Sequence, residues 1–325
     1  AYNMRATTWI ESFVHTVDLD MWQKPFFEKI RNYFLYCARP NDEFWAFGDG
    51  AERGPRLNPS RALILKSLMA HYGQRFDDPA SQWWADQVPL QKGDISSPVI
   101  PLILSEKTKG EAPINLPQAA LFNDVGWAGL HSDLSDIDND VFFLFKSSPF
   151  GSISHSHADQ NSFYLSVGGR ALAIPSGYYG PVYGMPHHAE WTRSTKANNS
   201  VLVNGEGQVV RDFTASGSIR DFVNTDKMTY FCGDAAPAYK GALTKFDRHV
   251  LFIRPGFFVI LDDLQAPEPS TFQWMLHSLE KTSIDPSAQK IEITRKGARA
   301  EFTLFTSSEE SIVFSQTDQF DTPFN

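Results

Sequence analysis

The first third of the chain has the hydrophobic spacing of helices. After Pro25, apolar side chains recur every three or four residues, at Phe26, Ile30, Tyr33, Phe34 and Cys37. This spacing predicts a helix with one buried face. A proline is tolerated in the first turn of a helix, and Pro40 lies just beyond the predicted end.

A second helix is predicted a short distance further along the chain. Asn58 is suited to the N-cap and Pro59 to the first helical position. The buried face of this helix would consist of Leu65, Leu68, Met69 and Tyr72. We expect the helix to end at Gly73, which is suited to a C-cap. The residues between the two helices, 44–50, form an aromatic loop that ends in turn residues.

The pattern then changes from helical to strand-like. Residues 86–118 contain five prolines, which predicts a connecting segment. Beyond it, short apolar or alternating runs are separated by Gly, Asn and Ser, and they cover residues 141–145, 162–167, 171–174 and 201–203. Gly168-Gly169 fits a two-residue hairpin turn. Two longer hairpins are predicted over residues 249–264 and 291–305. Many short strands in succession predict an antiparallel sandwich.

Composition narrows the classes of function. The 325 residues contain no apolar run of the roughly 20 residues that a membrane span needs. The formal net charge of -9 argues against a nucleic-acid partner, because a phosphate backbone requires a basic face. Cys37 and Cys232 have neither metal-ligand spacing nor the pattern of a disulfide framework. The sequence also lacks the serine-nucleophile and phosphate-loop motifs.

The densest run of polar residues extends from Ser154 to Asn161. On a regular strand, side chains two residues apart share a face, so His155 and His157 would project together. Two imidazoles on one face could begin an acid–base site or a metal site. One alternative is a pair of partly exposed histidines bonded to their neighbours. Another is a metal-dependent hydrolase that uses both histidines together with Asp159.

A second and a third polar segment follow. Residues 176–193 form a Gly/Pro-rich loop with an unusual share of aromatic and basic side chains: Tyr178, Tyr179, Tyr183, His187, His188, Trp191 and Arg193. Such a loop could line a pocket, or its tyrosines could pin it to the sandwich. Arg193 and Lys196 would give an acidic protein the local positive charge that a carboxylate ligand needs. For Lys196 alone, a solvated loop edge is the better interpretation.

These segments, in this order, resemble the heparinase II/III family of polysaccharide lyases. The family pattern is H-x-H-x-D, then D-S-G-x-Y, then R-x-x-x-x-H-N-S. Here it reads His155-Ser156-His157-Ala158-Asp159, then Pro175-Ser176-Gly177-Tyr178-Tyr179, then Arg193 to Ser200. The resemblance implies an α+β multidomain protein. Its residues 1–115 would be a helical domain, the C-terminal part of an α/α toroid plus a linker, and residues 116–325 a large antiparallel β-sandwich.

Two departures from the family pattern are informative. Members with a structural zinc ion bind it through the second His of H-x-H, the Asp of D-S-G and the His of H-N-S. Only His157 remains here, because Pro175 and Asn198 occupy the other positions. We therefore expect no metal at this place, and the resemblance implies no cofactor. The helical part is also far shorter than a full toroid, so the chain is expected to be a fragment whose N-terminal toroid segment is missing.

The resemblance implies a lyase that cleaves uronic-acid chains by β-elimination. It places His155 at the active site as base or carboxylate neutraliser, with Tyr178 and Tyr183 as candidate acids. The expected substrate-binding residues are His157, Gln160, Asn161, Tyr179, His187, His188, Trp191, Arg193 and Asn198.

The partner implied by the resemblance is an acidic oligo- or polysaccharide. The P-S-G-Y-Y and A-N-N-S variants look most like the oligo-alginate lyase branch. A heparin-type substrate and a non-catalytic carbohydrate-binding fragment remain alternatives. The family implies a bacterial source and leaves periplasm, cytoplasm and secretion open.

Overall fold

The computed structural model describes residues 19–43, 46–50, 59–88, 108–176, 183–307 and 311–323, with Ile10, Val14, Thr16 and Val17. The chain divides into two compact units. One contains residues 1–43, 53–116 and 133–137, and the other contains residues 44–52, 117–132 and 138–325. The short segment 44–52 therefore belongs to the second unit, although its neighbours on both sides belong to the first. The division into domains 1–115 and 116–325 stays a prediction.

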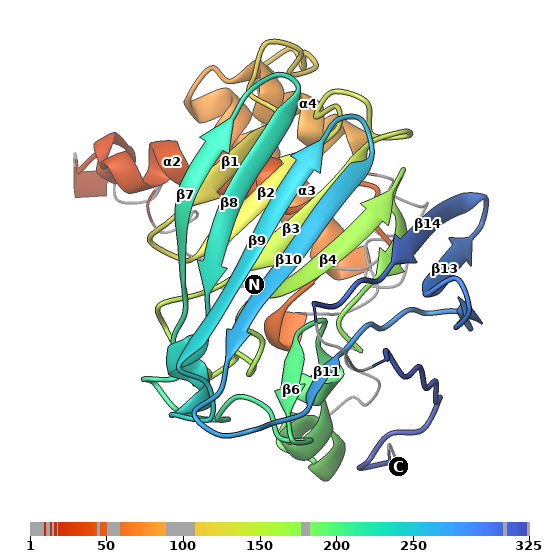
Figure 1. Cartoon of the computed structure of the whole chain (residues 1–325). Helices are drawn as coiled ribbons and strands as arrows, with labels where there is room; N and C mark the ends of the chain where they lie inside the picture. The colour runs from red at the N-terminus through yellow and green to blue at the C-terminus, as the bar shows by residue number, and fades with distance from the viewer. Residues whose placement is uncertain are drawn as a thin grey trace. The chain divides into compact units, whose positions relative to one another are not determined.

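The first unit contains three described α-helices, labelled in Figure 1: α2 (Pro25–Cys37), α3 (Pro59–Arg75) and α4 (Pro79–Gln87). The two predicted helices are confirmed, but α3 continues past Gly73. A Cβ atom on Gly73 would lie 3.0 Å from the Gln82 side chain of α4, so this glycine permits close helix packing. The sequence analysis did not predict α4. Its Trp84 is buried, and the indole N–H donates to the Ala38 carbonyl at 2.7 Å.

The second unit contains a five-stranded antiparallel sheet in which each strand pairs with the next along the chain. Its strands are β1 (Ala119–Phe122), β2 (Trp127–His131), β3 (Val141–Lys146), β4 (Ser162–Val167) and β5 (Arg170–Ala173). The strands β3 to β5 and the hairpin turn are confirmed, whereas β1 and β2 were not predicted. Gly168 and Gly169 have φ values of 53° and 73°, a region that favours glycine.

A four-stranded antiparallel sheet has the order β10-β9-β8-β7. These strands are β7 (Ser218–Asn224), β8 (Met228–Asp234), β9 (Lys245–Ile253) and β10 (Phe257–Gln265). The predicted β9–β10 hairpin is confirmed, and β7 and β8 were not predicted. Smaller sheets pair β6 (Val201–Val203) with β11 (Phe272–Trp274), and join β12 (Ser283–Asp285), β13 (Lys290–Arg295) and β14 (Ala298–Thr303). The last two strands form the second predicted hairpin.

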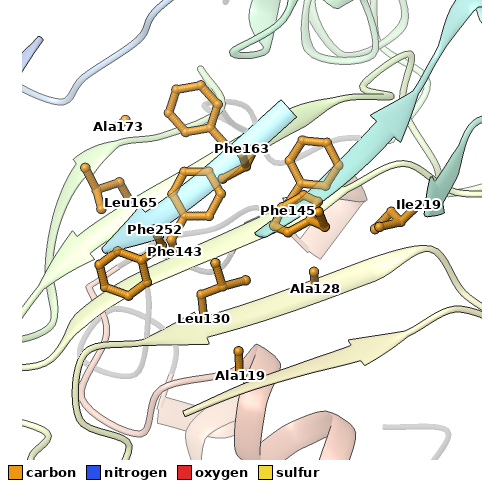
Figure 2. Close-up of a cluster of buried hydrophobic side chains, with 12 residues drawn as sticks. Ala119, Ala128, Leu130, Phe143, Phe145, Phe163, Leu165, Ala173, Ile219 and Phe252 are labelled. Carbon is orange, nitrogen blue, oxygen red and sulfur yellow. The ribbon is translucent and has the colours of Figure 1, made fainter. Parts of the chain in front are cut away.

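The two larger sheets share one hydrophobic core, which confirms the predicted sandwich. Aromatic rings from β3 and β4 (Phe143, Phe145 and Phe163) cluster with Phe231, Val250 and Phe252 from β8 and β9, as Figure 2 shows in part. The rings of Phe145 and Phe231 lie 4.9 Å apart. Burying each such side chain contributes about 1.5–3 kcal/mol. The core therefore gives the loops at the strand ends a rigid support.

Candidate functional site

The loop that carries the two histidines of the H-x-H motif is not a strand. Residues 152–161, here called the His155 loop, consist of turns and bends, and β4 begins only at Ser162. Ser154 has a φ of 51°, in the left-handed region. The regular strand on which the two histidines would share a face is therefore not present. Contacts from another segment hold the backbone in its bent form.

Arg193 supplies those contacts. Its guanidinium donates to the carbonyls of Ser152 at 2.8 Å and Ser156 at 2.9 Å, and also to that of Ser154. The Arg193 side chain is buried, and its guanidinium NH₂ groups bond to backbone carbonyls. Arg193, which was predicted to bind substrate, holds the His155 loop in place in the described arrangement. A planar guanidinium with five donors suits this role because it can reach several carbonyls at once.

Three histidines converge on the carboxylate of Asp49. This residue lies in the short helical turn η2 (Gly48–Gly50). Its Oδ2 lies 2.6 Å from His155 Nδ1, and its Oδ1 lies 2.9 Å from His157 Nε2 and 2.7 Å from His188 Nε2. His188 comes from η3 (His187–Thr192). The structure thus brings together His155, His157 and His188 from the predicted set around a carboxylate that the sequence analysis did not identify.

The three histidines differ in exposure. The side chains of His157 and His188 are buried, at 2% and 4% exposed, whereas that of His155 is 72% exposed. The ring of the exposed Tyr183 lies 5.4 Å from that of His155 and 4.9 Å from that of His188. His155 and Tyr183 are therefore adjacent groups that a large substrate can reach. Tyr178 and Tyr179 lie outside the described residues.

Hydrogen bonding fixes the proton positions in this cluster. The Gly184 N–H donates to His188 Nδ1 at 2.9 Å, so a neutral His188 carries its proton on Nε2 and donates it to Asp49. His155 contacts Asp49 through Nδ1, which places the proton of its neutral form on Nδ1 and the lone pair on Nε2. An exposed imidazole oriented in this way by a carboxylate has the arrangement of a general base.

The electrostatics of the cluster follow from burial and hydrogen bonding. Burial raises the pKa of Asp49, but hydrogen bonds from His157, His188 and His155 outweigh that effect and hold the pKa well below its usual value of 3.8. Burial lowers the pKa of His157, and its bond to Asp49 opposes this only in part. We infer that Asp49 is ionised at neutral pH and accepts three N–H donors.

A metal ion is the other way in which such a cluster could be used. Donor atoms of Asp49, His157 and His188 all lie within 4.8 Å of one another. However, His188 Nδ1 accepts the Gly184 N–H, so a neutral His188 carries its proton on Nε2. A protonated nitrogen has no lone pair for a metal, so Nε2 cannot be a ligand in this arrangement. The zinc position implied by the family fits no better, since Pro175 has no side-chain ligand atom and the amide of Asn198 is a poor zinc ligand. The donor set therefore favours a hydrogen-bonded network.

The predicted alternative that used Asp159 does not match the geometry. Asp159 is buried and pairs with the ammonium group of Lys146 on β3, whereas His155 and His157 contact Asp49. The three residues do not form a common ligand set among the described clusters of metal-binding side chains. A hydrolase centre built from His155, His157 and Asp159 is therefore not supported.

Gln160 and Asn161 were predicted to bind substrate, but both are fully buried. The side-chain amide oxygen of Gln160 (Oε1) accepts the Ser148 N–H at 2.6 Å. The Asn161 amide donates to the carbonyls of Gly233 at 2.9 Å and Phe246 at 3.1 Å. Both side chains satisfy backbone groups where the His155 loop meets the sandwich. In the described arrangement neither side chain is exposed to a ligand, so their substrate contact stays a prediction.

The remaining predicted residues also support the loop from within. Trp191 is buried and donates to the Ser176 hydroxyl at 2.9 Å, and Asn198 is buried with its amide bonded to backbone. His187 Nδ1 lies 2.7 Å from the carbonyl of Thr322 in the C-terminal segment. Lys196 forms a partly exposed ion pair with Asp321 at 2.6 Å. These side chains have structural contacts in the described arrangement, and the substrate contact predicted for His187, Trp191 and Asn198 stays a prediction. The ion pair of Lys196 fits the loop edge expected for it.

Comparison with known proteins identifies the relationship of the second unit. A sequence model of the family described as heparinase II/III-like, C-terminal, matches residues 115–325. A search of curated proteins found no match.

Solved structures show the same fold at low sequence identity. Heparan sulfate lyase HepC from Pedobacter heparinus superimposes with a TM-score of 0.61 and 16% identity over 86% of this chain and 39% of its own. The structure of a heparinase III has a TM-score of 0.62 and 16% sequence identity, over 88% of this chain and 42% of its own. The chain thus spans about two fifths of the length of these proteins. Among the described residues, no helix has the length and hydropathy to cross a membrane.

Proposed function

Since the chain belongs to the heparinase II/III-like family through its C-terminal domain, we propose that it forms part of a polysaccharide lyase that cleaves uronic-acid-containing chains by β-elimination. The observation that carries this proposal is the exposed His155, whose Nδ1 contacts Asp49 and whose Nε2 keeps a lone pair. β-Elimination needs such a base beside the sugar ring.

The proposed reaction begins at C5 of the uronate. Nε2 of His155 takes the C5 proton, and the electrons of that bond form the C4–C5 double bond. The C4–O4 bond breaks, and the departing O4 takes a proton from Tyr183 or from solvent. Asp49 stabilises the imidazolium ion that His155 becomes, so it acts as a positioning residue. The acid role proposed for Tyr183 is supported by the 5.4 Å between the centroids of its ring and the His155 ring.

The substrate carboxylate must also be neutralised, because the C5 proton is only weakly acidic beside an ionised carboxyl group. Arg193 is buried against backbone carbonyls and is not available for this. We propose that the neutralising group comes from the tyrosine loop around Tyr178 or from a toroid segment N-terminal to this chain. Tyr178, Tyr179 and that segment would complete the site.

We propose alginate oligosaccharides as the substrate, because the P-S-G-Y-Y and A-N-N-S variants at residues 175–179 and 197–200 look most like the oligo-alginate lyase branch. The structural neighbours, a heparan sulfate lyase and a heparinase III, support heparan sulfate as the second candidate. A carbohydrate-binding fragment without activity of its own is the third, since the chain spans only about two fifths of those proteins.

The test is the near-ultraviolet absorbance of the unsaturated uronate product. We would add this chain, and the longest form of the protein that its gene encodes, to alginate oligosaccharides and to heparan sulfate. A rise with alginate supports the proposed substrate, and a rise only with heparan sulfate supports the second candidate. No product from either form on either substrate, together with measurable binding, would favour the non-catalytic fragment.

The role of His155 has its own test. His155→Ala should lower turnover by about 10²–10⁴, the usual contribution of a general base. Glu268→Ala, at an exposed position in the loop between β10 and β11, is the control and should leave turnover unchanged. If the active form of the protein keeps its turnover in His155→Ala, then His155 is not the base.

A further inference from the structure

A second group of metal-binding side chains lies on the sheet β7–β10, away from the Asp49 cluster. The Cys232 thiol, an Asp247 carboxylate oxygen and a His249 ring nitrogen all lie within 4.8 Å of one another. The lyase reaction proposed above uses none of these three groups, and the hydrophobic cluster between the two larger sheets contains none of them. We propose that Cys232, Asp247 and His249 form a binding site for a zinc ion, with a fourth position left for water.

The ladder of strands β8 and β9 places the three ligands. Cys232 on β8 is the direct partner of His249 on β9, and Asp247 lies two residues before His249. Phe231 and Val250, the chain neighbours of Cys232 and His249, are core residues. Because side chains alternate along a strand, the three ligands point away from the core, on the outer face of the sheet. Figure 1 shows these strands side by side.

The donor atoms suit zinc. Thiolate sulfur, imidazole nitrogen and carboxylate oxygen are the ligands that zinc takes in proteins, and three protein ligands with an open position are a common set. Zinc bonds of about 2.0–2.3 Å place tetrahedral donors about 3.3–3.8 Å apart. The present separations of up to 4.8 Å therefore need a movement of about 1 Å. Asp247 and His249 are partly exposed side chains that can make this movement.

The neighbours of the ligands are compatible with this role. The Tyr230 hydroxyl lies 2.9 Å from His249 Nδ1, so a proton on Nδ1 can be donated to Tyr230 while Nε2 keeps the lone pair for the metal. Arg220 and Lys245 both approach Oδ2 of Asp247, at 2.8 Å and 3.8 Å, which leaves Oδ1 as the ligand atom.

The local charge is acidic. Asp234 and Asp263 are the direct strand partners of Asp247 on its two sides. The three carboxylates outnumber the two cations Arg220 and Lys245, so the surface attracts a divalent cation.

The thiol must lose its proton when the metal binds. Burial raises the pKa of Cys232 to about 11, and the nearby Arg220 opposes this only in part. Without metal, Cys232 is therefore a protonated, unreactive thiol at neutral pH. Zinc binding would release this proton to solvent, so the affinity should rise as the pH rises.

Cobalt(II) is the probe for the test, because a thiolate bound to Co²⁺ gives a charge-transfer band in the near ultraviolet. The intact chain should show this band at one Co²⁺ per chain, and Zn²⁺ should remove it by displacement. Cys232→Ser should abolish the band, whereas Cys37→Ser, at the other cysteine, should leave it unchanged. Asp49→Asn should also leave it unchanged, since histidine and carboxylate ligands without a thiolate do not produce it.

Two spectroscopic results would overturn the proposal: no thiolate band in the folded wild-type chain, or a band that survives in Cys232→Ser. His249→Gln provides a second check in case Cys232→Ser does not fold, because His249 is partly exposed and its loss leaves no core cavity. His249→Gln should weaken Zn²⁺ binding at least tenfold in calorimetric titration. An unchanged Kd in that variant would also refute the site.

Discussion

Asp49→Asn is the substitution that most directly tests the arrangement of the candidate active site. The carboxylate of Asp49 accepts N–H groups from three histidines, two at Oδ1 and one at Oδ2. Asparagine has the same shape but only one acceptor oxygen. If that oxygen serves the buried His157 and His188, then the amide NH₂ group faces His155 Nδ1. His155 must then accept at Nδ1 and carry its proton on Nε2, which removes the lone pair that acts as base.

The structure sets the expected magnitudes. A hydrogen bond to a charged group contributes about 1.5–3 kcal/mol and a neutral one about 0.5–1.5 kcal/mol. Two buried bonds that change from charged to neutral should therefore lower the free energy of unfolding by about 2–3 kcal/mol. Turnover should fall by about 10²–10⁴, because the wrong tautomer removes general-base catalysis without removing the side chain.

The same substitution changes the dependence of stability on pH. The pKa of Asp49 is held below its usual 3.8 in the folded protein. Its contribution to stability is therefore complete above about pH 4 and is lost as the pH falls through the lower folded pKa. Asp49→Asn should lack this acid-dependent component.

The assay combines lyase turnover, followed by product absorbance, with urea unfolding at several pH values. Glu268→Gln is the matched control, since it changes a carboxylate to an amide at an exposed position. Asp49→Asn that stays folded and keeps turnover within threefold of the wild type would refute the role of Asp49.

Three further predictions concern the scaffold. Arg193→Lys should lower the free energy of unfolding by about 2–3 kcal/mol, because an ammonium group cannot reach all three carbonyls of the His155 loop; an unchanged urea midpoint would contradict this. Gly233→Ala should lower the free energy of unfolding by about 1–3 kcal/mol, since the new Cβ would lie 2.4 Å from Asn161 Oδ1. Gly256→Ala, whose Cβ would lie 3.9 Å from Val141, is the control and should have little effect. Burial lowers the pKa of His277 to about 4, so the free energy of unfolding should fall as the pH decreases from about 6.5 to 4. Urea unfolding of His277→Asn over the same pH range should show a smaller fall.

The sequence could predict those elements whose signals are local. Pro25 and Pro59 mark the first residues of α2 and α3, and Gly168-Gly169 marks the β4–β5 turn. Strands such as β7 were missed because their pattern is weak: four of its seven residues are exposed and two more are only partly buried. The family resemblance supplied the sandwich as a whole, which local patterns alone only suggested.

The candidate site was predictable only in part, because its geometry depends on long-range contacts. The H-x-H motif indicated His155 and His157, but no local signal indicates that Arg193 bends their loop. Asp49 lies 106 residues from His155 along the chain. Its only sequence signal is a carboxylate between two glycines at the end of an aromatic loop.

The placement of Asp49 has a consequence for how such proteins can evolve. Residues 44–52 are separated from the rest of the second unit by a stretch of the first, so a single recombination point between the units would part Asp49 from its three histidines. A sandwich transferred to another gene without this segment would keep its core and lose the carboxylate that orients His155. The site is therefore kept only when the two units are inherited together. Selection would act against recombination that separates residues 44–52 from the rest of the second unit.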